Sequence, residues 1–405
     1  MSNLKKNTWT LNGWNDQTVA DQGSYSEDDT FWAWGSNNYG ALGLSEAHSG
    51  PSGKYSSPTQ IPGTTWSKIH KGQGSGYAVA IKTDGTMWAW GNGGYGGLGQ
   101  NAGPGGGILN YSSPVQIPGT SWNKVAISGR HFLAIRTDGT LWTAGSNQMG
   151  ELGQNKADVP GSGDTTEYSQ SSPIQIPGTW SDVATGTNRS YGIKANGTLW
   201  AWGYNQHGSL GLNEQYAHHS SPAQIHGGGT DWASLATSSD KFMMAVKTDG
   251  TLWGWGEAQN TGNLGHRHSA PTGINSRSSP IQIPGTNWSQ VSTTYSCVWA
   301  TKTDGTLWSW GQNQNGELGH NERNPNGYSS PVQVGTNTNW SKVRAGFQMA
   351  FLTTTGNAVF AVGNGTNGQL GLNDANDRSS PTIVGGGAWK DIAGGRYTSY
   401  GIRDW

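Results

Sequence analysis

The sequence predicts an all-β fold, a seven-bladed β-propeller, because three markers recur together along its 405 residues. The first marker is the glycine that closes a Trp-rich strand such as "TLWSWG", at Gly35, Gly91, Gly145, Gly203, Gly256, Gly311 and Gly363. The second is the proline of "SSP", at Pro58, Pro114, Pro173, Pro222, Pro280, Pro331 and Pro381. The third is a lone tryptophan, at Trp66, Trp122, Trp180, Trp232, Trp288, Trp340 and Trp389. Seven copies at intervals of about 54 residues indicate one repeat architecture rather than two or three domains.

Each repeat contains four short segments that are typical of strands. "SPVQIPG" alternates polar and apolar residues and ends in a Pro-Gly turn, and "WNKV" follows it. "FLAIRT" leads into Asp-Gly, which predicts a type I′ turn with positive φ at both central residues, and "LWAWG" is the return strand. No stretch shows a helical period longer than one turn. Four strands per repeat and seven repeats predict a propeller, which leaves only short sheet edges.

The two ends of the chain each carry half of a repeat. The chain finishes with "RYTSYGIRDW", which lacks a return strand, and the first repeat opens with that strand in "EDDTFWAWG". We therefore expect residues 30–35 to pair with residues 399–403 and close the ring. Residues 1–405 would form a single domain, with 1–29 as an N-terminal extension and 30–35 as the closing strand.

Composition excludes several classes of protein. Charged residues make up 12%, the net charge is -1, and no run of Lys and Arg suggests nucleic acid as a partner. No apolar run approaches the ~20 residues that would insert into a membrane. The first residues lack the apolar core of a secretory signal, so we expect a cytoplasmic protein or one assembled into a virion or other particle. Cys297 stands alone, which excludes an intrachain disulfide, and its strand position predicts burial.

Segments such as "HFLAIRTDGTLWTAGSNQMGELG" identify a family. The pattern resembles the regulator of chromosome condensation repeat over residues 30–403. The resemblance implies a seven-bladed propeller, closed by its N-terminal strand, that recognises proteins with one face of the disc. Founding members are exchange factors for a Ran-type small GTPase, and a plant UV-B photoreceptor and a β-lactamase inhibitor look similar in fold. Bacterial and viral relatives include effectors and virion components.

A variable triplet begins the strand before each Asp-Gly turn and is the predicted partner-binding surface. A framework of small residues follows it at Ala80, Ala134, Gly192, Ala245, Ala300 and Gly401, with Phe351 as the exception, which suggests close packing near the axis. Side chains that vary beside such a framework indicate recognition, although drift without function remains open. The candidate partner-binding residues on this funnel face are Tyr77, Arg130, His131, Asn188, Arg189, Lys241, Phe242, Tyr295, Phe347, Gln348, Arg396 and Tyr397.

No group of residues predicts chemistry. The loop "GQNQNGELG" lacks the Lys, the Ser or Thr and the following helix of a phosphate loop, and the His pairs at 218–219 and 266–268 lack further ligands at metal-binding spacing. We therefore expect no enzyme activity, no cofactor and no metal. The long polar loops between "LG" and "SSP" are a second possible contact surface at the rim.

Three functions remain open at this stage. The first is a non-enzymatic recognition or scaffold propeller, such as a virion, surface, adhesion or structural component. The second is a guanine-nucleotide exchange factor, against which stands the loss of the family's triplet His everywhere except His131. The third is a glycan-binding propeller that uses Trp and Tyr platforms. Photoreception would require Trp in the triplets, and none contains it. The partner is therefore another protein or a surface glycan, and the oligomeric state is open.

Overall fold

The computed structural model describes residues 29–46, 53–63, 65–72, 76–100, 110–157, 168–225, 227, 229–237, 242–258, 262–266 and 276–403. The predicted extension lies outside these residues except for Asp29. The described chain contains strands and two short 3-10 helices, Gly94–Gly96 and Gln206–Gly208, and no α-helix. It therefore includes no helix of the length and hydropathy needed to cross a membrane. The prediction of an all-β protein is confirmed.

The strands follow the four segments of the sequence repeat. The first strands are β3 (Trp66–Lys71), β7 (Trp122–Ile127), the second half of β10 (Gln170–Gly186), β14 (Trp232–Thr237), β18 (Trp288–Thr293), β22 (Trp340–Ala345) and β26 (Trp389–Gly394). The second strands are β4 (Tyr77–Lys82), β8 (His131–Arg136), β11 (Arg189–Lys194), β15 (Phe242–Lys247), β19 (Cys297–Lys302), β23 (Met349–Thr354) and β27 (Thr398–Arg403). The third strands are β1 (Thr30–Ser36), β5 (Met87–Gly91), β9 (Thr140–Gly145), β12 (Leu199–Gly203), β16 (Leu252–Gly256), β20 (Leu307–Asn313) and β24 (Val359–Gly363). The fourth strands are β2 (Lys54–Ile61), β6 (Tyr111–Ile117), the first half of β10, β13 (His219–Gln224), β17 (Arg277–Ile283), β21 (Asn324–Gln333) and β25 (Arg378–Ile383).

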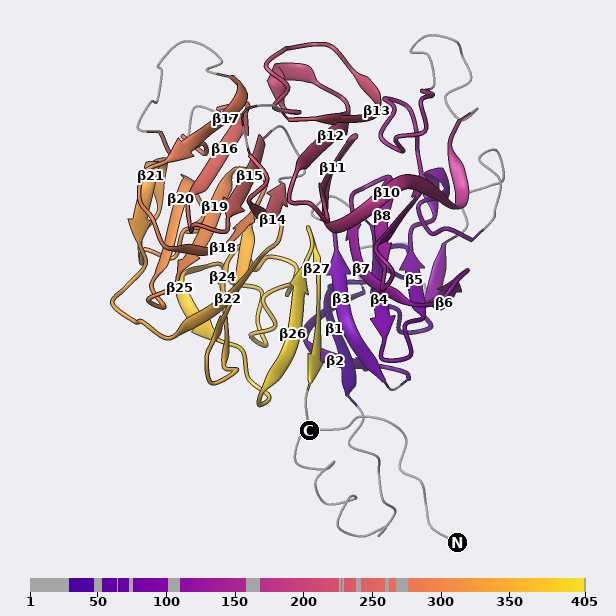
Figure 1. Cartoon of the computed structure of the whole chain (residues 1–405). Helices are drawn as coiled ribbons and strands as arrows, with labels where there is room; N and C mark the ends of the chain where they lie inside the picture. The colour runs from indigo at the N-terminus through magenta and orange to yellow at the C-terminus, as the bar shows by residue number, and fades with distance from the viewer. Residues whose placement is uncertain are drawn as a thin grey trace, which may run out of the picture.

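Neighbouring strands pair antiparallel in the order in which they occur along the chain. Five sheets have four strands each, and a sixth contains seven strands, β7 to β13. In that sheet β10 serves twice: its first half pairs with β9 and its second half pairs with β11. Successive first strands contact one another in the order β3, β7, β10, β14, β18, β22 and β26, and β26 contacts β3. Figure 1 shows the sheets following one another around a centre.

The two ends of the described chain meet in one sheet. β1 pairs with β27 from Thr30 opposite Arg403 to Gly35 opposite Thr398, and Figure 1 shows the yellow β27 beside the indigo β1. Phe31 and Trp34 of β1 are fully buried. The Trp34 Nε1–H donates to the Gln369 carbonyl at 2.8 Å, which ties β1 to the neighbouring sheet. The predicted pairing of the first and last strands is confirmed.

The Asp-Gly hairpins differ from the predicted turn type. Gly305 has φ +79°, whereas Asp304 is not among the residues with positive φ. The Gly305 N–H donates to the Lys302 carbonyl, and the Lys302 N–H donates to the Thr306 carbonyl, each at 3.0 Å. This is a three-residue loop, a type I turn followed by a left-handed glycine. The type I′ prediction is wrong because only one residue of the pair leaves the right-handed region.

The residues around that turn form a relay that recurs in several sheets. Asp304 Oδ1 accepts hydrogen bonds from the Thr306 N–H at 2.9 Å and from its hydroxyl at 2.7 Å. The Thr306 Oγ1 in turn accepts the Trp308 Nε1–H at 2.9 Å. The same relay starts from Asp84, Asp138, Asn196 and Asp249. The hydrogen bonds from Thr306 hold the pKa of the Asp304 carboxyl below its usual value.

This lowered pKa predicts a specific pH dependence. A carboxyl whose pKa is lower in the folded chain contributes stability above its unfolded pKa of about 3.9, and that contribution is lost as the pH falls through the folded pKa. Replacing the four aspartates Asp84, Asp138, Asp249 and Asp304 by Asn is expected to weaken the dependence of the thermal midpoint on pH between 5 and 2. Asn196 shows that Asn fits the turn. Tryptophan fluorescence measures the thermal midpoints. If the midpoint falls equally with pH in the wild-type chain and in the fourfold variant, the four aspartates do not cause the pH dependence.

A cation sits between two tryptophans at the end of most second strands. The Lys302 Nζ lies 4.7 Å from the Trp288 ring centroid and 4.6 Å from that of Trp308. The sandwich recurs at Lys82, Arg136, Lys194, Lys247 and Arg403, and Thr354 takes the place in β23. Partly desolvated cation–π contacts of this kind are worth about 0.5–2 kcal/mol each. The lone Trp, the Lys and the "LWxWG" Trp therefore form one structural unit.

The small residues of the second strands have a different role from the one expected. A Cβ added to Gly192 would lie 2.7 Å from the Trp180 ring, and one added to Gly401 would lie within 3.0 Å of Trp389. The small residue therefore makes room for the lone Trp of its own sheet and not for packing at the axis. Register also places Leu352, opposite Phe360, at this position, so the exception is Leu352 and not Phe351.

The glycines of "LG" form the contact between neighbouring sheets. A Cβ added to Gly265 would lie 2.9 Å from Nε1 of Trp310, which belongs to the next sheet. The Trp202 Nε1–H donates to the Glu151 carbonyl at 2.9 Å, and the Trp310 Nε1–H donates to the Asn263 carbonyl at the same distance. The Gly and Trp residues of the repeat therefore hold neighbouring repeats together.

Candidate functional site

The variable triplets lie at the hairpins that join first and second strands. In β22–β23, the Gly346 N–H donates to the Met349 carbonyl at 2.8 Å, which leaves Phe347 and Gln348 as a two-residue tip. Equivalent bonds join Ser128 to His131, Thr294 to Cys297 and Gly395 to Thr398. The described two-residue tips are Gly129-Arg130, Thr187-Asn188, Tyr295-Ser296, Phe347-Gln348 and Arg396-Tyr397.

Strand register assigns the third position of each triplet. The residue at this position lies opposite the glycine that follows the Trp-rich segment of the third strand, as Cys297 lies opposite Gly311. Met349 lies opposite Gly363, so Met349 and not Gln348 occupies that position in its sheet. Gln348 is a tip residue. The alignment of that triplet from sequence alone is therefore wrong by one residue.

Four predicted site residues at third positions are buried. The exposed fractions are 2% for Tyr77, 0% for His131, 4% for Arg189 and 1% for Phe242. Burial leaves little of these four predicted partner-binding side chains at the surface, because the third position begins the strand and its side chain packs against the neighbouring repeat. Phe242 belongs to a core cluster with Trp288.

His131 is held by hydroxyl groups on both sides. Its Nδ1 lies 2.9 Å from Ser128 Oγ, and its Nε2 lies 2.9 Å from Ser190 Oγ of β11, in the next repeat. Burial lowers the pKa of His131 to about 3, so the ring is neutral at physiological pH. The Tyr77 hydroxyl donates to the His131 carbonyl at 3.1 Å. His131 therefore connects its own repeat to the repeats on both sides, through its carbonyl to Tyr77 and through its ring to Ser190.

The remaining predicted residues reach the surface to different degrees. Arg396 and Tyr397 are exposed, and the side chains of Arg130, Asn188, Tyr295, Phe347 and Gln348 are half-buried. Arg130 Nη1 donates to Gln148 Oε1 at 2.6 Å, and Gln148 lies in the loop after β9. Lys241 lies outside the described residues. The triplets thus divide into exposed tips and buried strand starts.

Four tip residues from three neighbouring sheets form what we call the tip cluster: Tyr295, Phe347, Arg396 and Tyr397. The Tyr295 and Phe347 rings lie 5.0 Å apart. Arg396 Cζ lies 4.7 Å from the Phe347 ring centroid and 5.0 Å from that of Tyr397.

The backbone holds this cluster together as well. The Tyr295 N–H donates to the Phe347 carbonyl at 3.1 Å, and the Phe347 N–H donates to the Gly395 carbonyl at 3.2 Å. The cluster therefore presents aromatic and guanidinium surface in a fixed arrangement, and Tyr397 is 42% exposed.

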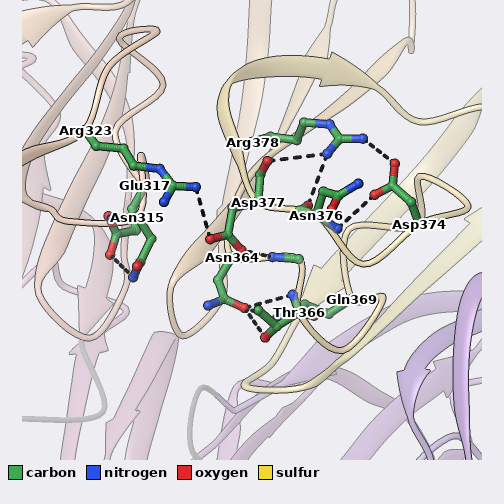
Figure 2. A network of polar contacts seen from close by, with 11 residues as sticks. Asn315, Glu317, Arg323, Asn364, Thr366, Gln369, Asp374, Asn376, Asp377 and Arg378 are labelled. Atoms are coloured by element: carbon green, nitrogen blue, oxygen red, sulfur yellow. Dashed lines mark hydrogen bonds and ion pairs between the residues drawn. The ribbon is translucent and has the colours of Figure 1, made fainter.

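The rim loops that the structure describes use their charges internally. Arg323 Nη2 lies 3.4 Å from Asp377 Oδ2, which joins the loop after β20 to the loop after β24 (Figure 2). Asp377 Oδ1 also accepts the Gly365 N–H at 3.0 Å, and Arg378 Nη2 lies 2.5 Å from Asp374 Oδ2. Because these groups are already paired, this part of the rim offers fewer free charges to a partner.

The structure places the other candidates for chemistry as follows. The Cys297 thiol is buried and donates to the Gln312 carbonyl at 3.0 Å, and burial raises its pKa well above the usual range. His219 contacts Glu214, a neighbour that the spacing did not suggest, and the His218 ring stacks on Tyr204 at 4.7 Å. Within the described ranges, no three His, Cys, Asp or Glu side chains meet as metal ligands would. His268 lies outside those ranges.

The repeats match one family. A model described as the regulator of chromosome condensation (RCC1) repeat matches residues 28–79, 84–135, 196–246, 304–352 and 357–402. A second model of the same description matches residues 122–151 and 180–209. Together these segments span more than half of the chain.

Individual relatives share the fold at low identity. The ultraviolet-B receptor UVR8 of Arabidopsis thaliana is 29% identical over 369 residues, which cover 88% of this chain and 78% of the receptor. The crystal structure of human WBSCR16 has a TM-score of 0.77 at 20% identity and covers 92% of this chain and 99% of that one. Prp20p of Saccharomyces cerevisiae, whose structure is described with its binding to Gsp1p and histones, has a TM-score of 0.77 at 17% identity, covering 93% and 92%. Both structural likenesses concern the fold alone.

Proposed function

We propose that this chain, which belongs to the regulator of chromosome condensation repeat family, is a non-enzymatic protein-recognition propeller whose partner binds the hairpin tips. The single observation that carries this proposal is the tip cluster, which joins Tyr295, Phe347 and Arg396 from three sheets. Tyr and Arg, together with Trp, are the residues most enriched in binding hot spots.

The proposal includes a single domain of seven blades, residues 1–405, closed by β1. Three observations support that count: the seven copies of each sequence marker, the shared β10 that divides the seven-stranded sheet into two units, and the contacts of first strands that return from β26 to β3. Equivalent loops of a propeller lie on the same face of the disc. The tips would therefore form one ring around the axis.

The charge of the tips indicates the kind of protein they fit. The described tips contain Arg130 and Arg396 and no Asp or Glu. A partner that presents carboxylates beside apolar side chains would complement this surface, because guanidinium groups form bidentate hydrogen bonds with carboxylates.

The other predicted functions have less support. The expectation of a virion, adhesion or structural component finds no support among the relatives named above. A glycan partner lacks support there as well. An exchange factor for a small GTPase remains the alternative, and its support is the family membership together with the fold shared with Prp20p.

Binding measurements on a tip variant test the proposal. Partners are captured with the wild-type chain from the cells that make it, identified, purified and titrated by calorimetry. Changing Phe347, Arg396 and Tyr397 together to Ala is expected to weaken binding by about 2 kcal/mol or more, roughly thirtyfold, since hot-spot residues cost this much. Folding should be nearly unchanged because the three side chains are half-buried or exposed.

Two comparisons keep this test decisive. The matched control changes Arg323 and Asn326 of the rim loop to Ala. Loss of binding in the rim control, with binding kept in the tip variant, would place recognition at the rim and refute the proposal. Nucleotide release from a purified Ran-type GTPase, accelerated by the chain, would favour the exchange-factor alternative.

A further inference from the structure

An axial cavity of about 610 Å³ runs between the first strands of all the sheets. Its lining includes Lys68 and His70 of β3, Lys124 of β7, Asp182 of β10 and Arg344 of β22. A space of this size falls in the range of small-ligand sites. The tip cluster is not part of its lining, so any ligand here is separate from the proposed partner.

The cationic groups of the cavity gather on one side. Lys68, Lys124 and Arg344 come from β3, β7 and β22, whereas the lining of β14 and β18 carries alanine, leucine, valine and uncharged polar residues. Lys71 contributes less charge, because burial lowers its pKa to about 7, and its Nζ donates to the Tyr77 carbonyl at 2.7 Å. The positive potential therefore comes mainly from the three side chains on β22, β3 and β7.

Two carboxylates offset part of this charge. Asp182 Oδ1 lies 3.1 Å from the Lys124 Nζ. Asp391 of β26 accepts the Ile69 N–H at 3.2 Å and lies 4.0 Å from the Arg344 Nε. Apart from Lys71, three cations against two carboxylates leave one net positive charge around the cavity.

The cations also keep hydrogen-bonding capacity. The Lys68 Nζ donates to Asn123 O at 2.7 Å and to Asn123 Oδ1 at 2.8 Å, and the Lys124 Nζ donates to Ser181 O and to Asp182. Each ammonium has three N–H groups, so one remains on each lysine.

His70 lies near enough to Lys68, Lys124 and Arg344 for their positive charges to act on its imidazole ring. Its Nε2 is buried and has no hydrogen-bond partner among the described residues. Burial, followed by the charges of Arg344, Lys68 and Lys124, lowers the pKa of His70 to about 3. A neutral imidazole can donate one N–H to an anion, and a buried donor without a partner destabilises the folded chain. An anion beside His70 would satisfy both the unpaired nitrogen and the excess charge.

We propose that Lys68, His70, Lys124 and Arg344 form a binding site for a small multivalent oxyanion of the phosphate or sulfate type in the axial cavity. The oxygens of such an anion accept hydrogen bonds from the ammonium, imidazole and guanidinium N–H groups, which are strengthened by charge. The free ion and the phosphate group of a larger ester share this chemistry, and the volume of the cavity admits either.

Titration of the full-length chain with inorganic phosphate, sulfate and ATP tests the site. Calorimetry in a chloride buffer of constant ionic strength is expected to give a Kd below about 1 mM for at least one of the three, and the two variants Lys124→Gln and Arg344→Gln are each expected to weaken it at least tenfold. The matched control is Lys342→Gln, since Lys342 lies two residues from Arg344, is exposed and is absent from the lining. Preference for phosphate over ATP identifies the free ion, and the reverse identifies an ester.

The pKa of His70, measured by nuclear magnetic resonance, reports on binding inside the cavity and should not respond to anions at the protein surface. Phosphate is expected to raise the pKa of His70 from about 3, because a bound anion favours the charged imidazolium. Equal loss of affinity in Lys342→Gln and Arg344→Gln, an unmoved His70 titration, or no binding at 10 mM in folded wild-type chain would each overturn the proposal.

Discussion

A chain that begins at residue 37 is expected to lose cooperative folding at 37 °C. Such a chain lacks β1, which lies between β2 and β27 in its sheet. Phe31 and Trp34 are both fully buried, and removal of a buried Phe or Trp side chain typically costs about 3–5 kcal/mol. Two such losses approach the whole stability of an ordinary domain, about 5–15 kcal/mol. Thermal unfolding followed by near-UV circular dichroism measures the effect.

Adding the strand back separates loss of β1 from a general effect of truncation. A synthetic peptide of residues 29–36 is expected to restore part of the thermal midpoint, because the backbone groups of β27 from Thr398 to Arg403 that β1 covers become available to it. A scrambled peptide of the same composition should not. A truncated chain with an unchanged midpoint would contradict the role assigned to β1.

The variant Gly311→Ala is expected to lose about 3 kcal/mol or more of unfolding free energy, because it combines backbone strain with a steric clash. Gly311 has φ +104°, and a Cβ there would lie within 3.0 Å of the Ser296 carbonyl oxygen and of the Cys297 Cα. The neighbouring atoms are backbone, so they cannot move aside without breaking the pairing of β19 with β20. Urea unfolding at equilibrium measures the loss.

Gly385→Ala is the matched control for this substitution. No heavy atom lies within 4 Å of the Cβ position at Gly385, and its φ is outside the left-handed region. Its unfolding free energy should change by less than about 1 kcal/mol, since Ala in a compatible conformation mainly reduces the entropy of the unfolded chain. Similar losses of unfolding free energy in both variants would show that backbone strain and steric clash at Gly311 do not cause the loss.

The candidate site was only partly predictable. The sequence identifies the triplets through their variability beside a periodic framework. It does not show that Arg396 stacks on Phe347, because these residues belong to different sheets and meet only when the sheets pack side by side. It also places Phe242 with the exposed residues, whereas the register makes it the first buried residue of β15. The sequence did not predict the cationic residues around His70 in the axial cavity, because they lie on β3, β7 and β22 and share no regular spacing.

By itself the sequence determined the repeat, the four strands of each unit and the pairing of the two ends, because all three follow from local period and from which half of a hairpin each end contains. Only the tertiary structure decided the turn type, the roles of the small residues and the neighbours of each charged group. The physical reason is that period 2 specifies which face of a strand a side chain takes, whereas the partner on that face depends on how sheets pack. Lys302 illustrates this difference: the sequence places it before Asp-Gly, but the packing of Trp288 and Trp308 on either side of it appears only in the folded sheet.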